Sequence, residues 1–199
     1  PMQTARSSLA AAVVNRHVYA IGGDNGIDYL AENERYDPTT DTWETVAPMK
    51  SPRTKHAVVT LGGHVYVIGG LYGRFLADVE KYDPVTDTWE TFAPIRTPRY
   101  GHGAAVVNGC IFVFGGMNEN NDYLASCEEY DPVTDAWTPI ADMPGGKRAY
   151  MACVSLEGHV YVAGGTFDGR STLSRFEKYD PITNTWETLP DMRADRAFV

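Results

Sequence analysis

The chain of 199 residues is 43% hydrophobic and 22% charged, a composition typical of a folded globular protein and not of a disordered one. Its net charge of −9 argues against non-specific nucleic-acid binding, and its apolar runs, such as 10–14 and 65–68, are far shorter than the roughly 20 residues that cross a bilayer. Three cysteines, Cys110, Cys127 and Cys153, at unrelated spacings indicate neither a disulfide framework nor a paired-cysteine metal site. We therefore expect a cytoplasmic protein with reduced thiols, no cofactor, no nucleic-acid partner and no membrane contact.

In chain order, each repeating unit opens with an arginine that stands 16 residues before a glycine pair. The arginines are Arg6, Arg53, Arg99 and Arg148, and the pairs begin at Gly22, Gly69, Gly115 and Gly164. A Tyr-Asp-Pro triplet follows, with a tryptophan seven residues after its tyrosine: Tyr36 and Trp43, Tyr82 and Trp89, Tyr130 and Trp137, Tyr179 and Trp186. These markers in phase predict one domain over 1–199, with repeats at about 1–47, 48–93, 94–142 and 143–191 and the start of a fifth at 192–199.

Within each unit, alternating apolar residues and turn signals predict four short strands, which in the second repeat cover about 56–61, 64–69, 78–82 and 88–92. Two-residue connections, most of them carrying Asn or Gly, favour a tight hairpin between the first two strands. Asp-Pro-x-Thr-Asp, or a close variant, joins the last two, because proline presets the turn and the flanking Asp and Thr side chains bond its backbone. One such sheet cannot bury both faces alone, so the sheets must stack, and radial stacking gives a propeller.

The combination Arg, Gly-Gly, Tyr-Asp-Pro, Trp and Pro-Met, as in Tyr36-Asp37-Pro38, Trp43 and Pro48-Met49, resembles the Kelch domains of BTB-Kelch proteins over the whole chain. The resemblance implies an all-β fold, a Kelch-type β-propeller with four blades of four antiparallel strands that form part of a six-bladed ring. An incomplete ring exposes two apolar sheet faces, so we expect the isolated chain to self-associate.

Length variation is concentrated between the glycine pair and the tyrosine, where the separations are 13, 12, 14 and 14 residues. These loops must project from one side of the disk, which is often the binding face of a repeat protein. Tyr29, Phe75 and Tyr123 occupy one aligned loop position, and both binding and loop anchoring remain open for them. The leucines that follow, Leu30, Leu76 and Leu124, are expected in the core.

In Kelch adaptors a peptide sits over the mouth of the central channel, against residues just after the repeat arginine and just after the glycine pair. The resemblance thus implies contacts from Ser7, Ser8, Thr54, Lys55, Tyr100, Gly101, Ala149 and Tyr150, and from Asp24, Leu71, Met117 and Thr166. With the loop residues added, the predicted partner-binding set is Ser8, Asp24, Tyr29, Lys55, Leu71, Tyr72, Arg74, Phe75, Tyr100, Met117, Tyr123, Tyr150, Thr166, Phe167 and Arg170. Lys55 is the only cation among the mouth positions, which favours a mixed apolar and hydrogen-bonding peptide over an acidic one.

Three other patterns have structural explanations that we prefer. His17, His64 and His159 recur on different blades, too far apart around a ring to bind one metal. Asp-Pro-x-Thr-Asp lacks the glycine and terminal Glu of a calcium loop. The repeat arginines suit hydrogen bonds to backbone carbonyls between blades.

The predicted function is therefore a protein-protein interaction module and not an enzyme. The resemblance implies the substrate-recognition propeller of a cullin-type ubiquitin ligase adaptor, with a protein or peptide ligand on the loop face. An actin-binding or scaffolding Kelch protein is the first alternative. A propeller enzyme such as a sugar-acid mutarotase is the second, but catalysis would need a non-repeating cluster, and the candidates, such as His102 near Tyr100 and Tyr150, are scattered.

Overall fold

The computed structural model describes residues 1–197, and it consists of four separate four-stranded antiparallel sheets. The first sheet contains β1 (Ala10–Val14), β2 (His17–Ile21), β3 (Asn33–Asp37) and β4 (Thr42–Val46), and the second contains β5 (Ala57–Leu61), β6 (His64–Ile68), β7 (Val79–Asp83) and β8 (Thr88–Phe92). The third contains β9 (Gly103–Val107), β10 (Cys110–Phe114), β11 (Cys127–Asp131) and β12 (Ala136–Ile140), and the fourth contains β13 (Ala152–Leu156), β14 (His159–Ala163), β15 (Phe176–Asp180) and β16 (Thr185–Leu189). Over the described residues, no helix is long and apolar enough to span a membrane.

Each sheet lies inside one predicted repeat, and its strands pair in chain order. The predicted strands of the second repeat agree with the observed ones to within one residue at each end. The first hairpin of every sheet turns through two residues with positive φ, for example Asn108 at 51° and Gly109 at 82°. This turn matches the right-handed twist of the two strands it joins, so the predicted tight hairpins are confirmed.

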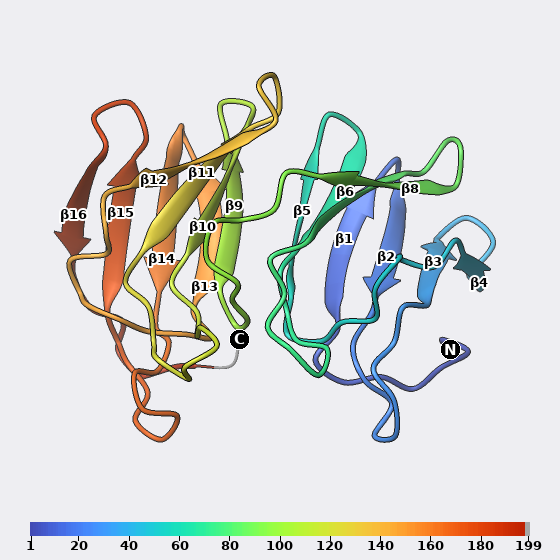
Figure 1. Cartoon of the computed structure of the whole chain (residues 1–199), viewed down its shortest axis with the longest axis horizontal. Helices are drawn as coiled ribbons and strands as arrows, with labels where there is room; N and C mark the ends of the chain where they lie inside the picture. Colours follow the sequence, from blue (N-terminus) through green and yellow to red (C-terminus); the bar gives the residue numbers. More distant parts are fainter. Residues whose placement is uncertain (198–199) are drawn as a thin grey trace.

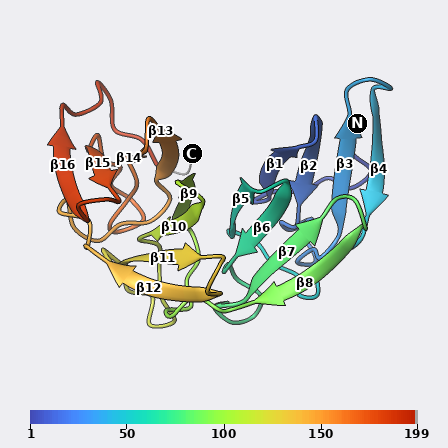
Figure 2. The same ribbon diagram turned by 90° about the horizontal axis from the view of Figure 1, so that it is seen from above.

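The four sheets are arranged like the blades of a propeller, with their first strands side by side on the inner side of the molecule (Figures 1 and 2). β1 packs beside β5, β5 beside β9, and β9 beside β13, so the first strand of every sheet is innermost. In Figure 2 the sheets form an arc with the first and fourth sheets at its two ends. Small residues on the inner strands permit this close approach. The Sγ of Cys153, for example, would lie 2.2 Å from a Cβ added to Gly103.

Apolar side chains fill the three spaces between neighbouring sheets, and the repeat tyrosines and tryptophans of the second, third and fourth sheets lie there as predicted; Tyr36 and Trp43 of the first sheet belong to none of these clusters. The Trp89 indole also donates a hydrogen bond to the Ala47 carbonyl of the preceding sheet at 2.8 Å. Asp87 accepts the Tyr82 hydroxyl at 2.7 Å and the Ala47 amide at 2.9 Å. The last acid of the Asp-Pro-x-Thr-Asp turn therefore links two sheets as well as shaping its own turn.

The repeat arginines are structural, but the prediction that their guanidinium groups bond carbonyls between blades is wrong. The guanidinium of Arg53 donates to the carbonyls of Gly69 and Asp78, both at 3.0 Å and both in its own sheet. Its third partner is the carboxylate of Glu80 on β7 at 2.5 Å, where both side chains are buried. The backbone of Arg53 makes the contact between blades, since its carbonyl accepts the Gly23 amide at 2.9 Å.

One face of the fourth sheet is uncovered in the described structure. Ala12, Val59 and Ala105 occupy one repeat position and are at most 9% exposed, whereas Val154 at the same position is 60% exposed. Leu156 is likewise 58% exposed, although Val14 and Val107 at its position are buried. The face that packs on a following sheet in the first three repeats therefore meets solvent in the fourth.

The predicted fifth repeat at 192–199 extends beyond the described part of the chain by two residues. Within that part, Arg196 stands where a repeat arginine belongs: its carbonyl accepts the Gly165 amide at 2.8 Å and its amide donates to Leu173 at 2.9 Å. The six-bladed ring stays a prediction.

Candidate functional site: the loop face

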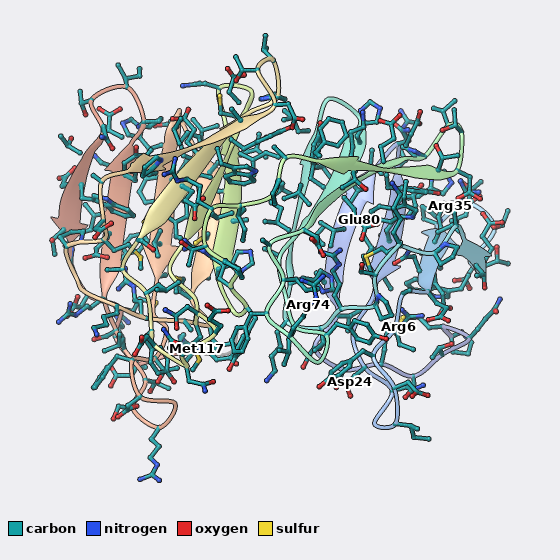
Figure 3. The ribbon with its side chains drawn as sticks, in the orientation of Figure 1. Arg6, Asp24, Arg35, Arg74, Glu80 and Met117 are labelled. Atoms are coloured by element: carbon teal, nitrogen blue, oxygen red, sulfur yellow. The ribbon has the colours of Figure 1, made fainter. Side chains whose placement is uncertain are left out.

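The loops after the second strand of each sheet emerge on one side of the molecule, opposite the two-residue hairpins (Figure 1). Figure 3 shows Asp24 and Met117, from the first and third of these loops, on that side. This surface is called the loop face below. The predicted grouping of the four variable loops on one face is therefore confirmed.

The two segments expected to form the site lie directly beside each other in every repeat. The residue after the repeat arginine pairs with the residue after the glycine pair, as in the bridge between Thr54 and Leu71. Their amides and carbonyls exchange hydrogen bonds of 3.1 and 2.9 Å. The same bridge joins Ser7 to Asp24, Tyr100 to Met117, and Ala149 to Thr166. Two stretches far apart in sequence thus form one strip that leads from each loop to the channel.

The next residue of each repeat bonds its counterparts in the neighbouring repeats, and these residues line the hollow on the inner side of the arc. Ser8, Lys55, Gly101 and Tyr150, the mouth ring, all have left-handed backbone angles, with φ between 50° and 62°. The amides of Lys55, Gly101 and Tyr150 each donate to the carbonyl of the preceding member, at 3.1, 2.9 and 2.7 Å in chain order. The backbone of the mouth ring is therefore the same in all four repeats, while its side chains differ in every one.

Aromatic rings surround Lys55 on the loop face. Its ammonium lies 5.3 Å from the centre of the Tyr100 ring and 5.9 Å from that of Tyr150, within the range of cation–π attraction. Phe75 packs on Tyr100 with ring centres 5.1 Å apart, and Tyr150 meets Tyr100 edge-on at 6.2 Å. Burial raises the pKa of the Tyr150 phenol, and the neighbouring Tyr100 adds to the shift, so the Tyr150 phenol stays neutral at physiological pH. Lys55, Phe75, Tyr100 and Tyr150 form the mouth cluster.

The mouth cluster depends on a glycine in the ring. A Cβ added to Gly101 would lie 2.9 Å from Cε1 of Tyr150, too close for a relaxed contact. Gly101 also has a φ of 62°, which costs little for glycine and more for other residues. The absence of a side chain there lets the Tyr150 ring lie flat over the backbone beside Tyr100.

A second aromatic pair lies over the first two loops. Tyr29 and Tyr72 are 40% and 46% exposed, and their rings meet edge-on with centres 6.0 Å apart. A hollow of about 310 Å³ opens beside Tyr29, between the first loop and the strip of the second repeat. The predicted residues Asp24, Lys55 and Leu71 line it.

The loops are held in shape by their own polar side chains. In the fourth loop, backbone amides of Ser171 and Arg170 and the Ser171 hydroxyl bind Asp168, which lowers the pKa of this carboxyl to about 2. Asn25 and Asn118 accept amides of the first and third loops in the same way. Such turns restrict the loops before any partner arrives, which reduces the entropy cost of binding.

The structure brings most of the predicted residues together but separates a few. Ser8 and the exposed Phe167 and Arg170 are available on the surface, and Arg74 is exposed although it pairs with Asp78 at 3.3 Å. The prediction that Thr166 contacts a partner is wrong: its side chain is fully buried, and its hydroxyl accepts the Gly169 amide at 2.9 Å. Its side chain therefore shapes the fourth loop and does not reach a partner.

The aligned aromatics both anchor their loops and face outward. Through its backbone Tyr29 bridges Asp24, as Phe75 bridges Leu71 and Tyr123 bridges Met117. Phe75 and Tyr123 are half-buried, so their rings serve the loop more than that of Tyr29 does. Of the leucines expected in the core, Leu30 and Leu76 are buried, whereas Leu124 is only half-buried.

Sequence reasoning missed a second ring just below the mouth ring, formed by Leu9, His56, His102 and Met151. These residues line a hollow of about 440 Å³ together with the mouth ring. Burial lowers the pKa of both histidines to about 3, and the charges of the repeat arginines add to the shift. His102, the residue considered for catalysis, is thus a neutral imidazole with both ring nitrogens shielded from solvent. The recurrence of histidine three residues after Arg53 and Arg99 was the available signal.

The described residues contain no cluster of three or more His, Cys, Asp or Glu side chains that could hold a metal ion. His17, His64 and His159 each place Nδ1 within 2.9 Å of a carbonyl of their own hairpin. These contacts give the recurring histidines a local role in the turn.

Four stacked sheets, the repeat markers and the loop face define a Kelch-type β-propeller, as the sequence predicted. A sequence model described as the Attractin/LZTR1 beta-propeller matches residues 18–198. The chain belongs to this family.

Shorter stretches are similar to curated proteins. The chain is 45% identical over 73 residues to "Influenza virus NS1A-binding protein homolog" of Mus musculus, which covers 37% of this chain and 11% of that protein. It is 37% identical over 70 residues to Kelch-like protein 15 of Gallus gallus, with coverage of 35% and 14%. It is 39% identical over 71 residues to F-box/kelch-repeat protein At1g67480 of Arabidopsis thaliana, with coverage of 35% and 19%. Each match spans less than a fifth of the relative's length.

A solved structure titled "Structure of YjhT" has a similar architecture. It matches with a TM-score of 0.87 at 20% sequence identity, and the match covers 98% of this chain and 68% of that one. At this identity the likeness concerns the fold alone.

Proposed function

We propose that the loop face binds a protein segment, and that the chain is the substrate-recognition propeller of a cytoplasmic, cullin-type ubiquitin ligase adaptor. The mouth ring is the observation that carries the first part. Its four residues share one backbone conformation but carry different side chains, so this conformation does not require serine, lysine or tyrosine at their positions; only Gly101 is required, by its close contact with Tyr150. Side chains that the scaffold leaves free are available for recognition.

The composition of the face supports a protein ligand. The mouth cluster combines three aromatic rings with a lysine, and the pair of Tyr29 and Tyr72 adds two more exposed rings. Aromatic residues, tyrosine above all, are enriched where proteins bind proteins, because they bury large areas with few rotatable bonds. The adaptor role is supported by relatives named as Kelch-like and as F-box/kelch-repeat proteins.

The test is proximity labelling in cells by the protein and by a Tyr100→Ala, Tyr150→Ala double variant. We expect the wild type to label a cullin together with other proteins, and the double variant to keep the cullin and lose part of the others. Each substitution removes a candidate hot spot worth about 1–2 kcal/mol of binding. Val133→Ala, at a 91% exposed position on an outer turn, is the control and should label like the wild type.

Two results would contradict the proposal. If the double variant labelled the same proteins as the wild type, the mouth cluster would not be the binding site. If it lost thermal stability to the same extent as it lost labelling, the two tyrosines would be loop anchors. Labelling of cytoskeletal proteins without a cullin would favour the actin-binding or scaffolding alternative.

A further inference from the structure

The hollow between the first loop and the second repeat differs in charge from the rest of the loop face. Asp24 and Asp28 line it on the side of the first loop, and Lys55 lies at its opposite edge. The Asp24 carboxylate accepts the Gly26 amide at 3.1 Å and the Ser7 hydroxyl at 3.2 Å, both neutral donors. Within residues 1–197, neither aspartate forms an ion pair with a lysine or arginine. Among the described residues, the hollow therefore has two carboxylates that no lysine or arginine pairs with, although Lys55 lies at its edge.

The remaining walls suit the apolar stem of a long side chain. Tyr29, Ile27 and Leu71 line the hollow, and Ile27 is 89% exposed. The edge-on contact with Tyr72 holds the Tyr29 ring in place. An aromatic face, two aliphatic side chains and two carboxylates together match a side chain with an apolar stem and a cationic end.

The protein's own lysine gives an independent indication that this surface binds cations. Lys55 does not pair with Asp24 or Asp28 and instead holds its ammonium over the rings of Tyr100 and Tyr150. Tyrosine faces of the loop face thus already stabilise one positive charge. Tyr29 offers a further ring beside carboxylates that Lys55 leaves free.

We propose that this hollow receives an arginine side chain of the bound segment, so that the loop face recognises a basic peptide. Arginine fits better than lysine, because its planar guanidinium both stacks on an aromatic ring and donates paired hydrogen bonds to carboxylates. The net charge of −9 favours the approach of such a segment. This inference rests on the proposed function and adds the chemistry of the ligand.

A library of random peptides displayed on phage, selected against the 199-residue chain, tests the inference. We expect the selected peptides to share an arginine, and a synthetic copy to bind about tenfold more weakly to an Asp24→Asn, Asp28→Asn double variant. Replacing that arginine by citrulline, which keeps the shape and removes the charge, should weaken binding to the wild type by a similar factor. A Glu119→Gln, Asp122→Asn double variant, which removes the same two negative charges from the third loop outside the hollow, is the matched control and should bind like the wild type.

The outcomes separate the inference from the proposed function. Peptides that lack a basic residue, but lose binding in the Tyr100→Ala, Tyr150→Ala variant, would overturn the arginine site and keep the loop face as a binding surface. Arginine peptides that bind the Asp24→Asn, Asp28→Asn variant as tightly as the wild type would also overturn it. Failure to enrich any peptide would count against both. Thermal unfolding of every variant checks that the fold is intact.

Discussion

The ion pair between Arg53 and Glu80 allows a strict test of what holds each blade together. Glu80 accepts the guanidinium at 2.5 Å and the backbone amides of Lys50 at 2.7 Å and Ser51 at 3.3 Å, and both charged side chains are buried. Burial lowers the pKa of Arg53, and the charge of Glu80 opposes this shift. Glu80→Gln keeps the shape and removes the charge, which leaves a buried cation without its partner. We expect the free energy of unfolding to fall by about 3–5 kcal/mol.

A matched control lies on the neighbouring strand. Glu90 on β8 pairs with Lys81 at 3.1 Å but is 64% exposed, so Glu90→Gln makes the same charge change in solvent and should cost less than about 1 kcal/mol. Thermal unfolding followed by circular dichroism measures both. For a domain of this size, about 2–4 °C per kcal/mol places the midpoint of Glu80→Gln some 6–20 °C below that of the wild type. If the two variants unfolded within about 1 kcal/mol of each other, the buried pair would not be what stabilises the blade.

Two further predictions concern pH and association. Burial lowers the pKa of His102 from 6.5 to about 3, so the unfolded chain takes up a proton below pH 6.5 that the folded chain refuses. The free energy of unfolding should therefore decrease as the pH is lowered, by about 2 kcal/mol for this residue between pH 7 and 5. His102→Leu should flatten the pH dependence of the unfolding free energy by that amount, and an unchanged slope would refute the assignment. The uncovered face around Val154 and Leu156 predicts that the 199-residue chain self-associates and that Leu156→Lys weakens the association. Gel filtration with light scattering measures this, and a monomer at every concentration would contradict it.

The fold was predictable because the same sequence markers recur at nearly constant spacing in four repeats. A hairpin turn with positive φ occurs in all four repeats. The repeat tyrosine bonds an acid in the first three and Asn184 in the fourth, and the tryptophan bonds the preceding sheet in the last three. The second-strand side chains that fill the spaces between sheets alternate in the way a strand requires. Element boundaries were accurate because short hairpins leave little freedom in where a strand ends.

The direction of the arginine contacts was not predictable in the same way. The spacing of Arg53 from its glycine pair shows that the side chain has a structural partner, but spacing alone does not distinguish its own sheet from the next. Its acidic partner was missed because Glu80 stands among polar residues on a strand whose sequence does not show that Glu80 is buried. A signal existed: a glutamate precedes the repeat tyrosine by two residues in all four repeats, at Glu34, Glu80, Glu128 and Glu177.

Aligning the four repeats with one another predicted which positions line the loop face, but it did not predict how exposed each side chain is. Asp24 and Leu71 line the loop-face hollow, but Thr166 at the same repeat position is buried, and its hydroxyl accepts the Gly169 amide at 2.9 Å. Asp24 also accepts an amide of its own loop and still lines the hollow, so the exposure of a loop residue depends on how its loop packs. That packing differs between loops of different length and is not repeated.

The loop face carries two kinds of chemistry at separate places, and together they give a bound segment a direction. The hollow beside Tyr29 contains the unpaired carboxylates of Asp24 and Asp28, whereas the mouth cluster around Tyr100 and Tyr150 presents aromatic rings that a lysine already covers. A second cation over those rings would repel Lys55, so the basic residue of a ligand belongs over the first loop. Its apolar residues then belong toward the third and fourth repeats. A segment with the opposite order would place its charge against Lys55 and leave the carboxylates uncompensated, so the surface discriminates by arrangement as well as by composition.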